Sequence, residues 1–213
     1  AFVKITYLEG QAVTALHLKD TSVSGGSKNS IFVKFNRLGF LHVLRGWDHL
    51  LFLAGLTLIC WRMKQVFVLA SVFTLAHGSS LTLVALGYGS GLAKISEIAI
   101  AMTILYMAKA IVDHQKDGIK LVNMFGPVFI FGLIHGMGFA NALGEIGIPD
   151  DQLIVSLLSF NFGVEISQLL FIVLLFNLLK LIPSQNDFKI DPKLVLSYGI
   201  GSLGAYIFID RLN

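Results

Sequence analysis

The feature that constrains this chain most is a series of apolar runs, each long enough to cross a lipid bilayer. A bilayer core takes about 20 residues of α-helix, and from Leu38 onward such runs alternate with short segments rich in charge, glycine or proline. Only 14% of the residues are charged, against about 25% in soluble domains. The sequence therefore predicts an all-α polytopic membrane protein with six spans, at residues 38–60, 65–87, 93–112, 121–143, 152–181 and 193–210.

The first 35 residues have a different pattern. Glu9, Gly10 and Gln11 separate two short apolar segments, as in a β-hairpin, and residues 21–30 are rich in serine and glycine, as in a linker. We therefore expect a small N-terminal β-element at residues 1–35 and a helical membrane domain at residues 36–213. A seventh helix would arise if the fifth run, which is longer than one bilayer, breaks.

The charges between the predicted spans set an orientation. Loops one, three and five carry the positive charges, and loop four is acidic. Because positively charged loops stay in the cytoplasm, the sequence predicts a bacterial inner-membrane protein whose termini and β-element are extracytoplasmic. No basic stripe suited to nucleic acid is present, and the single cysteine, Cys60, excludes an internal disulfide and a cysteine-rich metal site.

Ionisable side chains inside the predicted spans are the strongest functional signal, since such residues are costly in a membrane. His42, Arg45, Asp48 and His49 lie in the first span, His77 in the second, His135 in the fourth and Glu165 in the fifth. Helical rise puts most of them roughly 12–20 Å below the outer surface, with His42 higher, at about 6 Å. Four helices would thus bring imidazole or carboxylate groups to similar depths.

This set of side chains suits a divalent metal ion. Neutral imidazole binds Ni, Co and Zn, and carboxylates complete or orient such sites. We expect His49, His77 and His135 to be ligands, followed by His42 and Asp48, with Arg45 as the counter-ion of Asp48. Glu165 fits three roles: ligand, partner of a ligand, or general base. Each histidine taken singly also fits a hydrogen bond between helices.

The same residues carry a resemblance to a known family. The segment from His42 to His49 is an H-x5-D-H motif, and it occurs here with FTLAH ending at His77, FGLIHGMGFA around His135 and FNFGVE ending at Glu165. Together these motifs resemble the HupE/UreJ family of hydrogenase and urease accessory membrane proteins, in the branch with an extracytoplasmic β-region. The resemblance implies nickel permeation, with nickel bound by His42, Asp48 and His49, and partners in metalloenzyme maturation.

Two functions follow from these observations, and the sequence leaves both open. The resemblance favours metal transport, which requires polar groups along both halves of the path. The predicted cytoplasmic halves are almost without such groups. That asymmetry favours a membrane metallohydrolase of the zinc type, with Glu165 or Asp48 as the base. A structural subunit without metal is a third class, and a homo-oligomer is compatible with all three.

Overall fold

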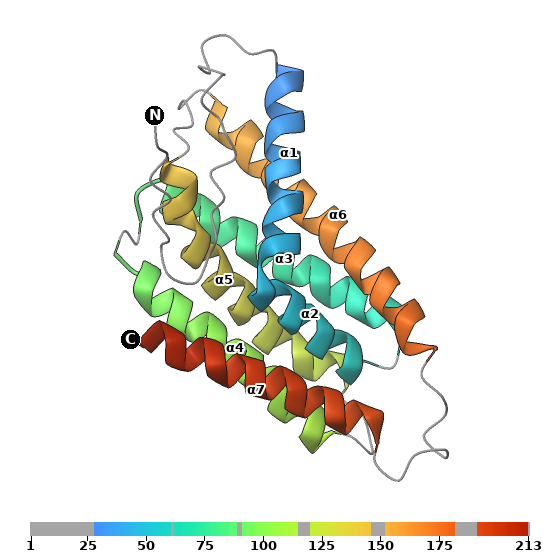
Figure 1. Ribbon diagram of the computed structural model, residues 1–213. Coiled ribbons are helices and arrows are strands. Elements are labelled where there is room, and N and C mark those ends of the chain that lie inside the picture. The colour runs from blue at the N-terminus through green and yellow to red at the C-terminus, as the bar shows by residue number, and fades with distance from the viewer. Residues whose placement is uncertain are drawn as a thin grey trace, which may run out of the picture.

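The computed structural model describes residues 28–60, 62–88, 91–114, 120–145, 152–181 and 191–212. The helices in these residues are α1 (Lys28–Arg45), α2 (Trp47–Ile59), α3 (Met63–Ala85), α4 (Ala93–Asp113), α5 (Leu121–Glu145), α6 (Leu153–Leu179) and α7 (Pro192–Leu212), shown in Figure 1. Helices α3 to α7 are each long and apolar enough to cross a membrane. The prediction of an all-α polytopic membrane protein is confirmed, with seven helices in the described part of the chain.

The first predicted span is not one helix. The chain breaks at Gly46, whose backbone is extended (φ −80°, ψ 98°), so α1 ends at Arg45 and α2 begins at Trp47. The N–H of Gly46 donates to the carbonyl of His42 at 3.0 Å, and the carbonyl of Gly46 accepts from Leu50 at 3.1 Å. The seventh helix therefore comes from a break in the first apolar run, whereas the fifth run stays intact as α6.

Helix α1 also begins earlier than the sequence suggested. Residues 28–35, expected to belong to the linker and the β-element, form its first two turns. The predicted hairpin itself lies outside the described residues.

The helices pack as three close pairs around α2. Helix α1 packs on α6, α3 on α5, and α4 on α7, while the short α2 contacts α4, α6, α1, α7 and α3 (Figure 1). Because α2 starts in the middle of this arrangement, residues in its first turn face several other helices at once. Asp48 and His49 are both in that turn and are buried.

Glycines allow the paired helices to approach closely. A Cβ on Gly39 of α1 would overlap the carbonyl of Phe160 on α6, and a Cβ on Gly163 would overlap the carbonyl of Asn36. Gly132 and Gly136 of α5 lie in the same way against the carbonyls of Phe73 and His77 on α3. Close approach at small residues is typical of membrane helices. Gly132 and Gly136 flank His135 in the sequence, so α5 approaches α3 closely where His135 lies.

Candidate metal centre

Four histidines from four helices meet in the interior. His42 is in the last turn of α1, His49 in the first turn of α2, His77 on α3 and His135 on α5. His49, His77 and His135 have at most 2% of their surface exposed. The ring centroid of His49 lies 4.7 Å from that of His42, 5.0 Å from that of His135 and 6.1 Å from that of His77. His49 is thus in contact range of all the others.

Three of these rings can share one ion. His42, His49 and His77 each offer a nitrogen, and the three nitrogens lie within 4.8 Å of one another. Two nitrogens bound to one ion at about 2.1 Å can be at most about 4.2 Å apart. Small rotations of the side chains would therefore bring this group into ligating range.

The break at Gly46 explains why His42 belongs here. Counting along one continuous helix placed His42 nearer the membrane surface than His49. The extended backbone at Gly46 changes the direction of the chain, and the two rings lie edge to face. The rings of His42 and His49 are therefore much closer together than counting along one continuous helix predicted.

Hydrogen bonds at the opposite ring nitrogens fix the tautomers. His49 Nδ1–H donates to Asp48 Oδ1 at 3.2 Å. His77 Nδ1–H donates to Asn161 Oδ1 at 3.3 Å, since the amide nitrogen of Asn161 already donates to the carbonyl of Leu157. Partners of this kind at the second nitrogen hold metal-binding histidines in place. The Nε2 atoms of His49 and His77 are then left as lone-pair acceptors.

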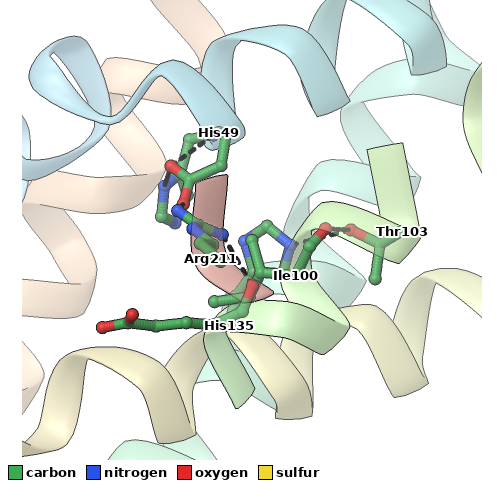
Figure 2. Close-up of polar contacts among 7 residues, drawn as sticks. His49, Ile100, Thr103, His135 and Arg211 are labelled. Carbon is green, nitrogen blue, oxygen red and sulfur yellow. Dashed lines mark hydrogen bonds and ion pairs between the residues drawn. The ribbon is translucent and has the colours of Figure 1, made fainter. Parts of the chain in front are cut away.

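His135 follows the same rule with its nitrogens exchanged. The hydroxyl of Thr103 on α4 donates to the carbonyl of Ile100 at 2.7 Å, so its oxygen accepts from His135 Nε2–H at 3.1 Å (Figure 2). This leaves Nδ1 of His135 as the lone-pair nitrogen. The buried ring nitrogens without a hydrogen-bond partner among the described residues are Nε2 of His42, His49 and His77, and Nδ1 of His135.

Asp48 supports the cluster through hydrogen bonds to His49 and Arg211. Its Oδ1 accepts from the backbone N–H of His49 at 3.0 Å as well as from the ring. Its Oδ2 accepts from Nη2 of Arg211, on α7, at 3.1 Å. Because both oxygens are engaged, Asp48 orients His49 in this structure, whereas the sequence suggested it as a ligand or a base.

Arg211 is the residue that the sequence reading missed. It is 7% exposed, and its Nη1 donates to the backbone carbonyl of Glu97 on α4 at 2.7 Å, so it joins α7 to α4 and α2 (Figure 2). Arg45, the counter-ion predicted for Asp48, is exposed. In the sequence, Arg211 is an arginine at the end of an apolar span. Such an arginine usually lies at the membrane interface, so little in the sequence indicated a buried role.

Glu165 lies apart from the histidines. Its Oε1 accepts from the hydroxyl of Ser71, on α3, at 2.6 Å. In the part of the chain that the structure describes, the group of ligand atoms within 4.8 Å includes neither Glu165, nor Asp48, nor His135. His135 joins the cluster through its ring contact with His49, whereas Glu165 makes no described hydrogen bond or ion pair to a histidine.

A family model described as HupE / UreJ protein matches residues 18–210. The chain belongs to the HupE/UreJ family. A comparison with curated proteins and one with solved structures gave no match. The match includes all seven described helices up to Asp210, and with them the four histidines.

Proposed function

We propose that this HupE/UreJ protein binds a divalent transition-metal ion at its four histidines and carries it across the inner membrane, with nickel as the first candidate cargo. The observation that carries the proposal is that His42, His49 and His77 each offer a ring nitrogen within 4.8 Å of the other two. Nε2 of each of these rings is buried without a hydrogen-bond partner among the described residues. A set of imidazoles prefers Ni, Co, Zn or Cu(II) over the oxygen-seeking Mg and Ca. The family match supports the same class of cargo.

The residues have distinct roles in this proposal. His42, His49 and His77 are the ligands, with His135 as a fourth beside His49. Asp48 is a positioning residue, because it holds the tautomer of His49 while Arg211 balances its charge. The charge pattern of the loops supports an inner-membrane location with the N-terminal side extracytoplasmic. Nickel delivery to hydrogenase or urease maturation is the physiological role that we infer.

The metallohydrolase receives less support. It needs a base beside the ion, and the two candidates were Asp48 and Glu165. Asp48 is bound by His49 and Arg211, and Glu165 is hydrogen-bonded to Ser71 outside the histidine group. The buried rings fit an ion that is held and passed on better than a site that must admit water and a substrate.

Two measurements test the proposal. Equilibrium dialysis of purified protein should give about one bound Ni²⁺ per chain, and His77→Ala should abolish it. His114→Ala is the matched control, since His114 lies at the end of α4 and bonds the carbonyl of Ala110. Proteoliposomes containing a nickel-sensitive dye should show uptake with the wild type and not with His77→Ala. Binding without uptake would reject transport, and unchanged binding in His77→Ala would reject the site.

A further inference from the structure

A line of polar side chains runs along the contact between α3 and α6, beginning at the metal centre. The helices pack against each other, and three hydrogen bonds cross between them. His77 bonds Asn161, Thr74 donates to Gln168 at 3.3 Å, and Ser71 donates to Glu165 at 2.6 Å. We call these six residues the α3–α6 polar seam.

The seam leads away from the histidines toward one membrane face. Asn161 pairs with His77. Glu165 and Gln168, which come later in α6, pair with residues that precede His77 in α3, so the two helices are antiparallel. Glu165 lies four residues beyond Asn161, or about 6 Å farther along α6. Continuing in that direction, α3 begins at Met63 beside exposed Arg62 and Lys64, and α6 ends at Leu179, as Figure 1 shows. Glu165 is thus placed between the metal centre and the face with the positively charged loop.

Glu165 differs from Asp48 in the partners of its carboxylate. Asp48 is paired with Arg211, whereas Oε2 of Glu165 is buried without a hydrogen-bond partner in the described structure. Nε2 of Gln168, itself fully buried, is also without a partner there. Polar groups left unsatisfied inside a membrane are costly and mark ion pathways. Oε2 of Glu165 is therefore available to bind a cation.

The histidine centre and Glu165 differ in the charge that they offer to a bound cation. Imidazole ligands carry no negative charge, and the charge of Asp48 is balanced by Arg211, so an ion at the histidines keeps its full charge inside the membrane. A carboxylate with one unpartnered oxygen would lower that cost at the next step. Oxygen ligands bind nickel less strongly than imidazole does, and a weaker second position helps an ion to leave.

We propose that Glu165, positioned by Ser71, is a second cation-binding station, through which the ion passes between the histidines and the membrane face that carries Arg62 and Lys64. The proposal rests on the transport function proposed above. It gives the path a polar step in the half that the sequence alone left almost without one.

The test separates the charge of Glu165 from its hydrogen bond. Glu165→Gln removes the charge and still accepts from Ser71, whereas Ser71→Ala removes the hydrogen bond and keeps the charge. In proteoliposomes, we expect Glu165→Gln to slow Ni²⁺ uptake by about tenfold or more, and Ser71→Ala to slow it less. Both variants should keep the Ni²⁺ that the histidines bind in equilibrium dialysis. Unchanged uptake in Glu165→Gln, or loss of the bound Ni²⁺, would overturn the station.

A binding measurement decides the case in which the wild type shows no uptake. That result alone would reject transport. Mn²⁺ prefers oxygen ligands, so its binding can be followed by electron paramagnetic resonance in His77→Ala protein. If His77→Ala protein binds Mn²⁺ and the double variant His77→Ala/Glu165→Gln does not, the station is supported without a transport measurement. Equal Mn²⁺ binding with and without Glu165→Gln overturns it.

Discussion

The guanidinium of Arg211 and the carboxylate of Asp48 form a buried ion pair, 3.1 Å apart, between residues separated by 163 positions in the sequence. Their side chains are 4% and 3% exposed. Through this pair α7, which packs mainly on α4, becomes part of the support of the histidine centre. The last helix thus contributes no ligand, but it fixes the residue that orients one.

The ion pair gives a prediction about stability. Arg211→Gln leaves the carboxylate of Asp48 buried without its counter-charge, and breaking such a pair costs about 3–5 kcal/mol. Thermal unfolding in detergent, followed by circular dichroism, should show a clear loss of stability. Asp48→Asn combined with Arg211→Gln should lose less than Arg211→Gln alone, because no isolated charge remains. Arg45→Gln is the control, since Arg45 is exposed; an equal loss there would contradict the assignment.

The second partner of His135 gives a prediction about affinity. Thr103→Val keeps the volume of the side chain and removes the oxygen that accepts from His135 Nε2. Loss of such a partner typically lowers metal affinity by about 10–100-fold. Isothermal titration with Ni²⁺ should measure this decrease. Thr57→Val is a matched control, because Thr57 is equally buried and bonds only its own helix, at the carbonyl of Leu53. The same affinity in both variants would place His135 outside the centre.

Gly46 gives a prediction about geometry. A Cβ there would lie 2.8 Å from Nδ1 of His49 and 3.0 Å from Oδ1 of Asp48. The added Cβ would also lie 3.0 Å from the carbonyl oxygen of His42. The backbone of Gly46 (φ −80°) is accessible to alanine, so the effect of Gly46→Ala would come from displacing these three groups. We expect Ni²⁺ affinity to fall by at least about tenfold, as measured by isothermal titration. Gly199→Ala, where no atom lies within 4 Å of the added Cβ, should bind normally. Normal binding by Gly46→Ala would contradict the described arrangement.

The sequence predicted the spans of α3 to α7 well, because bilayer length requires long apolar runs whatever the packing. It did not predict the break at Gly46, since residues 47–59 continue an apolar pattern and a glycine within such a run does not by itself end a membrane helix. The wide separation expected between His42 and His49 followed from that error. The histidines were found because ionisable residues in membrane spans are rare.

The partners of the site were harder to predict than its histidines. The sequence suggested Arg45, three residues before Asp48, as its counter-ion. The actual partner, Arg211, comes from the other end of the described chain. Depth along a helix likewise placed Glu165 near the histidines. Depth does not determine which neighbouring helix a side chain faces, and Glu165 bonds Ser71 instead.

The crossing of α1 and α6 gives the last prediction, which links packing to metal binding. A Cβ on Gly39 would overlap the carbonyl of Phe160, so Gly39→Ala must separate the two helices. Overpacking of this kind costs typically about 1–3 kcal/mol.

The same shift should reach the metal centre. The ring of Phe160 packs 5.5 Å from that of His42, and the next residue, Asn161, holds His77. We therefore expect Gly39→Ala to lower the midpoint of thermal unfolding and Ni²⁺ affinity together, while Gly199→Ala changes neither. Lower stability with wild-type affinity would mean that α6 does not transmit the displacement, and that the tautomer of His77 does not depend on where Asn161 is held.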